Sequence, residues 1–333
     1  MDPTPISPTV AQAALDRLAG FPVAQFGHYP TPVDELARFR AGAALRQQIL
    51  VKRDDAISFG FGGNKVRKLR YVIPPLLADG VDTVITCGGL QSNHARATAA
   101  AATVSGLQCH IIVNGTAPRD LTGNARLNRL LGASVDYVTG REMRRPGMEA
   151  ALARFAAAGR RPAIIPLGAS TAHGALGFVA AVGEMVAQGI TPDVIVHAGS
   201  SGGTSAGLLA GVALHRLPTR VVSISADDPP AAIEAEIREI TTGLDTILDT
   251  GGAISAAIRP EIDDGYVGPG YGEPTPGSTE AQQRLARDEA LFVDHTYTAK
   301  AAAGMIDYCR RGLIAPDASV LFWHTGGQVA LFA

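Results

Sequence analysis

The stretch of sequence that decides the fold is VIVHAGSSGGTSAGLLAGVALHR, residues 194–216. It opens with Val194–Val196, a short β-branched run of the kind found in strands that are buried on both faces. A turn rich in Gly and Ser follows, and a helical pattern then runs from Ser205 to Arg216. A buried strand, a small-residue turn and a helix are the repeating parts of a parallel α/β sheet.

The same alternation recurs along the chain. The other predicted strands are Thr83–Thr86, His110–Val113, Val135–Val138, Ala163–Pro166, Val221–Ile224 and Val320–Phe322. The other predicted helices are Ala95–Ser105, Leu121–Leu131, Glu142–Ala158 and Ala175–Gln188. This order predicts an α/β fold with mainly parallel sheets.

The length of 333 residues predicts two open α/β domains rather than one minimal core. A strand and a small, flexible run between Pro162 and Gly174 indicate where the chain crosses between them. We predict a smaller domain at 65–160 and a larger domain made of 1–64 and 161–333. The Gly- and Pro-rich residues 263–278 predict a long ordered loop over a site.

The composition excludes several classes of function. Lys+Arg 29 against Asp+Glu 31 gives a net charge of −2, so binding to nucleic acid or to an anionic membrane surface has no electrostatic basis. The three cysteines are far apart and form no CxxC pair, so we expect no disulfide or metal site and a cytoplasmic location. We find no signal-peptide pattern and no apolar run near the roughly 18 residues of a membrane span.

Ligands of parallel sheets bind beyond the carboxyl ends of the strands, so the turns that follow the predicted strands are the candidate binding sites. The first, FGFGGNKVRKL at 59–69, predicts a helix capped by Asn64 with Lys65 in its first turn. The field of a helix start lowers the pKa of an amine and favours the neutral nucleophile of imine chemistry. The alternative is a solvated basic helix start. The only lysines in the chain are Lys52, Lys65, Lys68 and Lys300.

The second turn is CGGLQSNHAR at 87–96, directly after a predicted strand. Its glycines allow close backbone approach, and Ser92 or Asn93 can cap the next helix. These hydroxyl and amide groups either face a ligand or serve as caps alone. His94 taken by itself is typical of a structural histidine.

The third turn is AGSSGGTSAG at 198–207. The backbone amides of a Gly-rich turn at a helix start form a phosphate site. It is not a Walker A loop, because Thr204 stands where the lysine of that motif would be, and Gly199 is followed by Ser200 and Ser201, so it is not GxGxxG either. The alternative is a tight strand-to-helix turn.

The fourth turn, FWHTGG at 322–327, places Thr325 at the end of a strand with its hydroxyl free, unless it is simply a glycine turn. The four turns together offer an amine, a polar turn, a phosphate cradle and a hydroxyl. Pyridoxal 5′-phosphate (PLP), with its aldehyde, phosphate and ring nitrogen, needs that set.

These segments resemble the 1-aminocyclopropane-1-carboxylate (ACC) deaminase/D-cysteine desulfhydrase family of fold type II, tryptophan-synthase-β-like PLP enzymes. The resemblance runs from Tyr29 to the end of the chain. The matching segments are YPTPVDEL, VKRDD, GGNKVRKL, QSNHAR, IPLGAS, SSGGTSAGL, GPGYGEP, YTAKAAAGMID and HTGGQVALF. The resemblance implies two domains with PLP in the cleft between them, and a homodimer.

The resemblance also implies roles for single residues. Lys65 is expected to form the Schiff base with PLP, and Lys68 is not. Asn93 is expected to hydrogen-bond the ring hydroxyl of the cofactor, and Ser92 to face the substrate carboxylate. The expected phosphate ligands are Ser201, Gly202, Gly203 and Thr204.

Thr325 is expected to contact the ring nitrogen, with Thr298 close by. The expected catalytic residues are Lys65, Ser92, Tyr271 and Tyr297. The expected substrate contacts are Ser92, Asn93, His94, Tyr271 and Tyr297.

Two positions guide the choice of substrate within the family. The deaminase type carries Glu after the second tyrosine and a residue other than His after QSN, whereas this chain has Thr298 and His94. This resembles the desulfhydrase side. A neutral hydroxyl at the ring nitrogen leaves the pyridine less protonated, which suits a β-leaving group better than the opening of a cyclopropane.

Other positions depart from the family pattern: 294–297 is DHTY in place of Asp-Pro-Val-Tyr, and TAKAAAG is similar to the L-cysteate sulfo-lyases. We therefore predict an α,β-elimination lyase for a small amino acid, D-cysteine giving pyruvate, ammonia and hydrogen sulfide. The alternatives within the family are an L-cysteate sulfo-lyase and an ACC deaminase. The alternative of another class is a phosphosugar- or nucleotide-binding module with no imine chemistry.

Overall fold

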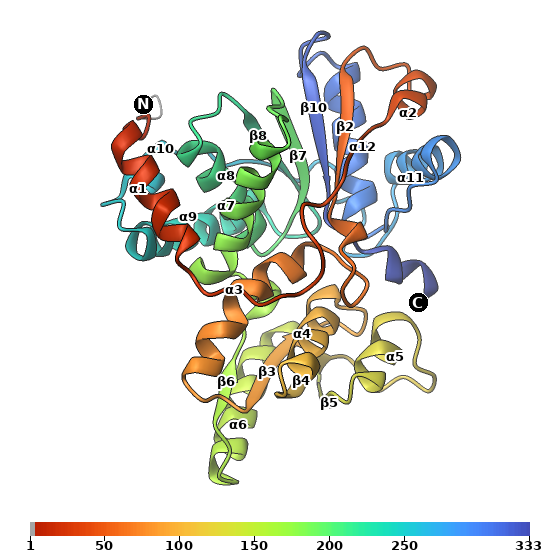
Figure 1. Ribbon diagram of the computed structural model, residues 1–333. Coiled ribbons are helices and arrows are strands. Elements are labelled where there is room, and N and C mark those ends of the chain that lie inside the picture. Colours follow the sequence, from red (N-terminus) through yellow and green to blue (C-terminus); the bar gives the residue numbers. More distant parts are fainter. Residues whose placement is uncertain (1–3) are drawn as a thin grey trace.

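The computed structural model describes residues 4–333, whose strands form two separate sheets. In Figure 1 the larger sheet lies in the upper part of the molecule and the smaller sheet in the lower part. The larger sheet has the order β1 (Val33–Glu35), β2 (Gln48–Arg53), β10 (Ser319–His324), β7 (Val194–Gly199), β8 (Arg220–Ser225), β9 (Glu261–Asp263). The smaller has the order β5 (Ser134–Val138), β4 (Gln108–Asn114), β3 (Thr83–Gly88), β6 (Pro162–Ile164).

All strand pairs are parallel within the described residues except β1 with β2. In the middle of the larger sheet, Val320 on β10 is in register with Ile49 on β2 and Val194 on β7. The predicted α/β fold with mainly parallel sheets is therefore confirmed. The carboxyl ends of each parallel set meet at one edge, which is where such sheets bind ligands.

Helices cover both faces of each sheet (Figure 1). One face of the larger sheet is covered by α1 (Pro8–Ala19), α7 (Ala172–Ala187), α8 (Gly203–Leu214), α9 (Pro230–Leu248) and α10 (Ala253–Ala257). Its other face is covered by α2 (Ala37–Gly42), α11 (Pro276–Glu289) and α12 (Thr298–Arg310). The smaller sheet packs against α3 (Asn64–Ala78) and α4 (Asn93–Val104) on one face and α6 (Arg144–Ala157) on the other, and α5 (Gly123–Leu130) packs against α4. No helix within 4–333 is long and apolar enough to cross a bilayer.

The predicted domain boundaries stay a proposal. The strands of the smaller sheet fall between Thr83 and Ile164, so β6 begins two residues after the predicted segment 65–160 ends. The predicted loop at 263–278 is irregular only between β9 and α11, because Pro276 already begins α11 with Thr275 as its N-cap.

The predicted strands and helices are all present, with ends that move by up to three residues. Three strands were missed, β1, β2 and β9. The strand β2 reads QILVKR and ends on two charges that are buried or half-buried in ion pairs, Lys52 with Glu184 and Arg53 with Asp55. The strands β1 (VDE) and β9 (EID) are three residues long and mostly acidic, so neither carries an apolar pattern.

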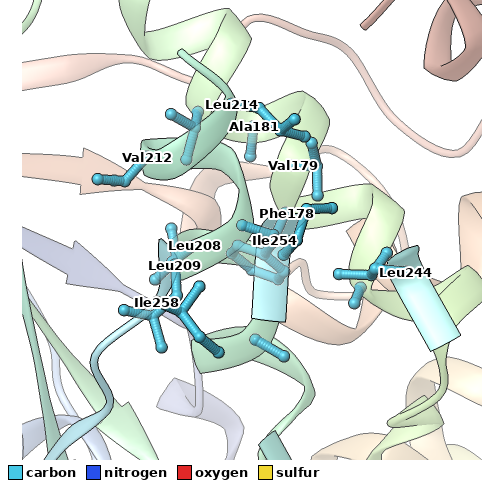
Figure 2. Packing of buried hydrophobic residues seen from close by; sticks show 14 of the residues in the cluster. Phe178, Val179, Ala181, Leu208, Leu209, Val212, Leu214, Leu244, Ile254 and Ile258 are labelled. Atoms are coloured by element: carbon cyan, nitrogen blue, oxygen red, sulfur yellow. The ribbon is translucent and has the colours of Figure 1, made fainter. Parts of the chain in front are cut away.

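The helices α7 and α8 pack closely in the main core, part of which is drawn in Figure 2. A Cβ atom on Gly207 would lie 2.4 Å from the Cβ of Phe178, and one on Gly211 would lie 2.7 Å from Val182. These glycines therefore allow the two helices to approach each other. Because α8 follows the turn at 200–202, this packing fixes the turn as well.

A buried cluster of charges anchors α3 to the larger sheet. Arg67 donates hydrogen bonds to Asp54 at 2.8 Å and to Glu184 at 2.9 Å, and these carboxylates also accept from Trp323 and Lys52. The cluster has two positive and two negative side chains, and all except Glu184 are essentially inaccessible to solvent. Burial of these charges is tolerated because each one is paired.

We expect Arg67→Met to lower the free energy of unfolding by about 3–5 kcal/mol, because Asp54 would be left buried without a cation. Methionine keeps a similar helix propensity, so the charge is the main change. Urea unfolding of wild type and variant measures the loss. The control is Arg70→Met, three residues along the same helix, whose guanidinium stacks over Tyr29 and donates to Ala24 O at 3.3 Å, contacts that together contribute about 1–2 kcal/mol. Equal losses in the two variants would contradict this assignment.

Candidate active site

A cavity of about 1020 Å³, open to solvent, lies at the carboxyl ends of β3, β7, β8 and β10. The starts of α3, α4 and α8 border it as well. Most predicted site residues line it, namely Lys65, Ser92, Asn93, His94, Ser201, Gly202, Thr204, Tyr271, Tyr297 and Thr325. Gly203 and Thr298 do not line it.

Lys65 is the second residue of α3, whereas the expected cap at Asn64 would have made it the first. The N-cap is Gly63, not Asn64, and φ of +97° at Gly63 is a conformation that glycine adopts without strain. The side chain of Asn64 instead donates to Thr204 Oγ1 at 3.0 Å. The expected cap is therefore wrong, because Asn64 makes a tertiary contact that ties α3 to the start of α8.

The amine of Lys65 has no hydrogen-bond or ion-pair partner in residues 4–333, and it lines the cavity. Burial lowers the pKa of Lys65 to about 8, because the charged form loses its hydration. A sizeable neutral fraction therefore exists near neutral pH. A neutral, unpaired amine facing a cavity is what attack on an aldehyde requires.

The predicted polar turn after β3 lies at the cavity. Ser92 is the N-cap of α4 and accepts from the N–H of Ala95, and a Cβ atom on Gly88 would lie 2.5 Å from Ser92 Oγ. The Oδ1 atom of Asn93 accepts from Asn124 at 2.9 Å, and Asn93 Nδ2 has no protein partner among residues 4–333. A free amide N–H at this place can donate to a ligand oxygen.

His94 also lines the cavity, but its ring nitrogens are already engaged. Thr86 donates its hydroxyl to Ile165 O, so at 2.7 Å it accepts from His94 Nε2–H, and Thr98 lies 3.4 Å from Nδ1. Burial, with a smaller effect from Lys65, holds the pKa of His94 well below its usual value. His94 is thus neutral. Because both ring nitrogens are engaged, a substrate could contact only the carbon atoms of the ring.

The turn at 200–204 forms the expected cradle at the start of α8. Gly202 has φ of +71°, and backbone N–H groups at a helix start attract a phosphate. Ser201 Oγ lies 2.8 Å from Ser170 Oγ. A Cβ atom on Gly203 would lie 2.8 Å from Lys68 Nζ, so Gly203 closes the back of the cradle rather than lining the cavity.

Lys68 is a site residue whose role was missed. It is buried, lines the cavity and donates to Gly168 O at 3.1 Å and to Ser170 Oγ at 3.2 Å. Burial, with a smaller effect from Lys65, holds the pKa of Lys68 well below its usual value. The spacing of three residues from Lys65 places both amines on one face of α3, and that spacing was the available signal.

The two predicted tyrosines meet at the cavity. Tyr271 lies in the loop between β9 and α11, Tyr297 precedes α12, and their hydroxyl oxygens are 2.6 Å apart. Burial raises the pKa of Tyr297 well above its usual value, and proximity to Tyr271 adds to this. Burial also raises the pKa of Tyr271. Both phenols are therefore protonated at neutral pH.

The two predicted threonines are placed differently. Thr325 follows β10, lines the cavity and has a hydroxyl with no protein partner in residues 4–333. Thr298 is fully buried at the start of α12, and its hydroxyl donates to Asp294 Oδ1 at 2.7 Å. The expectation that Thr298 lies close to the ring nitrogen stays a prediction, and Asp294 holds its hydroxyl at the helix start.

Four charged residues of the cavity were also missed: Arg141, Arg144, Asp227 and Asp228. Arg141 and Arg144 follow β5 of the smaller sheet, and the two aspartates follow β8 of the larger sheet. Neither segment contains a motif, so only the tertiary fold brings them together.

A family model described as "Pyridoxal-phosphate dependent enzyme" matches residues 24–326. An ACC deaminase from Methylobacterium sp. (strain 4-46) is 37% identical over 330 residues, which cover 95% of this chain and 97% of that protein. An ACC deaminase from Burkholderia multivorans is 38% identical over 332 residues, 96% of this chain and 97% of that protein.

The chain belongs to the ACC deaminase family of PLP-dependent enzymes.

A crystal structure of an ACC deaminase homologue matches this member of the family with a TM-score of 0.88 and 31% identity over 96% of each chain. A threonine deaminase from Solanum lycopersicum matches with a TM-score of 0.69 and 17% identity over 98% of this chain and 87% of that one, which shows the fold alone. The cofactor of the family is PLP, as the sequence predicted, and the fold is type II. The alternative of a binding module without imine chemistry is thereby overturned.

The residues present fit this cofactor. An unpaired amine, a glycine-bearing cradle at a helix start, a free amide N–H and a free hydroxyl line one cavity. These groups suit the aldehyde, phosphate, ring hydroxyl and ring nitrogen of PLP. The individual contacts of Lys65, Asn93 and Thr325 with the cofactor remain proposals.

We expect the rate at which the apoenzyme takes up PLP covalently to rise with pH through a midpoint of about 8, because only the neutral amine of Lys65 attacks the aldehyde. The visible absorbance of the bound cofactor, followed at several pH values, measures this rate. An α-acetylated lysine amide in solution is the control and should show a midpoint near the ordinary lysine value. If the protein showed that same ordinary midpoint, burial would not be activating Lys65.

Proposed function

We propose that this chain is a lyase for α,β-elimination on a small amino acid, with D-cysteine as its substrate. The observation that carries the proposal is the set of neutral hydroxyl residues: Thr298 stands where the deaminase type carries Glu, and Thr325 has a free hydroxyl at the end of β10. A neutral hydroxyl leaves a pyridine nitrogen less protonated than a carboxylate would. A weaker electron sink suits a substrate whose β-substituent leaves readily, and a thiol on the β-carbon is such a group.

The carboxylates of the cavity do not change this conclusion. Asp227 and Asp228 follow β8, whereas Thr325 follows β10, and β7 lies between these strands. Two strand spacings separate the ends by about 10 Å. Neither aspartate is thus placed to take the role of Thr325.

Bound PLP would supply the electron-withdrawing ring that stabilises negative charge at the substrate Cα. Lys65 would hold the cofactor until the substrate amine takes its place, and its released amine would then accept the Cα proton. A pKa of about 8 suits a base that works near neutral pH. The two tyrosines are weaker candidates for this base, because burial keeps their phenols protonated.

The remaining groups would bind and orient the substrate. The oxygen of Ser92 already accepts from the Ala95 N–H, so its own proton is available to a substrate carboxylate. The protonated phenols of Tyr271 and Tyr297 can donate to the departing sulfur. The overall reaction is D-cysteine plus water giving pyruvate, ammonia and hydrogen sulfide. The Cα–H and Cβ–S bonds break, and water replaces the nitrogen as the imine tautomer of 2-aminoacrylate hydrolyses.

A second candidate is ACC deaminase. Relatives that carry this name are 36–38% identical to the chain over nearly its whole length. The position after the second tyrosine favours the desulfhydrase, because Thr298 stands where the deaminase type carries Glu. The choice therefore depends on Thr298 together with Thr325. An L-cysteate sulfo-lyase is the third candidate function.

We also propose a cytoplasmic homodimer. The three cysteines are buried and unpaired, which a reducing compartment allows. Sedimentation of the holoenzyme would test the dimer.

The decisive assay offers the PLP-loaded protein D-cysteine, L-cysteine, L-cysteate and ACC in parallel. We expect pyruvate and sulfide from D-cysteine alone. Sulfite from L-cysteate would move the function to the sulfo-lyases, and 2-oxobutyrate from ACC would show that a hydroxyl at Thr325 suffices for ring opening. Either result would overturn the proposed substrate.

Lys65→Ala should lose elimination activity and covalent PLP, because no other lysine amine that lines the cavity is unpaired in the described structure. Borohydride treatment followed by mass spectrometry locates the labelled lysine in wild type. Lys68→Arg, which keeps hydrogen-bond donors beneath the phosphate cradle, is the matched control and should keep the label on Lys65. Full activity in Lys65→Ala would refute the assignment.

A further inference from the structure

The mouth of the cavity holds an ion pair that joins the two sheets. Arg141 begins η2 (Arg141–Met143), which follows β5 of the smaller sheet, and Asp227 follows β8 of the larger sheet. Arg141 Nη1 donates to Asp227 Oδ2, and both residues line the cavity. The Arg141 side chain is 50% exposed, and ion pairs this exposed add little to folding stability. The contact is therefore not explained by a need to hold the fold together.

The same guanidinium also packs against Tyr271, in the loop between β9 and α11. The Arg141 guanidinium carbon lies 5.0 Å from the centre of the Tyr271 ring, within the range of a cation–π contact. Asp227 thus fixes the guanidinium, and the guanidinium contacts Tyr271. The Tyr271 hydroxyl in turn meets that of Tyr297 at 2.6 Å.

The backbone around Tyr271 does not fix its side chain. Gly268, Gly270 and Gly272 all have positive φ, which permits many paths for the chain. Lys300 holds the loop from below, donating to Val267 O and Gly270 O at 2.7 Å each.

These bonds place the backbone of the loop, while the direction of the Tyr271 ring depends on side-chain contacts. Tyr297, edge-on at 5.7 Å, provides one such contact and Arg141 provides the other.

We propose that Arg141 is a positioning residue that, held by Asp227, keeps the Tyr271 phenol on Tyr297 and directed at the substrate. The inference rests on the proposed function for its effect on turnover, but the positioning itself does not depend on which substrate is used. Arg141 acts through Tyr271, and the ion pair makes the arrangement depend on both sheets being in place.

The positioning is tested without substrate by ¹⁹F NMR of protein labelled with 3-fluorotyrosine. The chain has seven tyrosines, and Tyr271→Phe identifies the resonance of Tyr271. We expect Arg141→Gln and Asp227→Asn to shift or broaden that resonance. Arg141→Lys should change it less than Arg141→Gln does. Arg145→Gln is the matched control, because Arg145 is 85% exposed and, in the part of the chain that the structure describes, pairs only with Glu149. An unchanged Tyr271 resonance in Arg141→Gln would overturn the proposal.

The effect on catalysis is tested on the PLP-loaded enzyme with the substrate found in the panel. We expect Arg141→Gln to lower kcat by about tenfold to a hundredfold, the usual cost of a misplaced group, with covalent PLP unchanged and a smaller change in KM. In a Tyr271→Phe background the same change should have little further effect, since it acts through Tyr271. An equal further loss there would overturn the positioning role.

The two proposals fail in different ways. If wild type turns over none of the four substrates but the Tyr271 resonance still moves in Arg141→Gln, the proposed function is wrong and the positioning stands. If D-cysteine is consumed and kcat is the same in Arg141→Gln and wild type, the proposed function stands and the catalytic part of this inference is wrong.

Discussion

The buried pairing of Arg67 with Asp54 and Glu184 is the constraint on which the rest of the site depends. It fixes α3 against the larger sheet through one residue, while Lys65 and Lys68 reach the cavity from the same helix. Residues two apart on a helix do not share a face, so the anchor and the reactive amine point in different directions. A charge cluster that contacts no ligand thereby determines where the nucleophile stands.

Three helix starts then converge on the cavity, those of α3, α4 and α8. Each directs the partial positive charge of a helix start toward the same space. This field suits an anionic cofactor and makes a charged lysine less favourable, in line with the lowered pKa values of Lys65 and Lys68. The polar side chains of Asn93 and Thr325 line the cavity from different segments, which follow β3 and β10.

The sequence predicted what is local and could not predict what is tertiary. Strand–turn–helix units, the Ser92 cap and the amine of Lys65 follow from neighbouring residues, and the structure has them where expected. The cap at Asn64 was wrong because a contact with Thr204, 140 residues away, took its side chain. The pairing of Thr298 with Asp294 was not predicted either, although only four residues separate them. Arg141 and Asp227 lie in segments without motifs, and only the folding of both sheets brings them into contact.

The four lysines share one further property, which is that none lies on the outer surface. Lys52, Lys68 and Lys300 are buried and bonded, and Lys65 alone opens into the cavity. Amine-directed reagents such as activated esters and dialdehydes therefore meet, besides the α-amine of the chain, a single accessible target. Immobilisation or fluorescent tagging through lysine would attach at the reactive centre itself, so handles for this protein are better placed elsewhere, on introduced surface thiols.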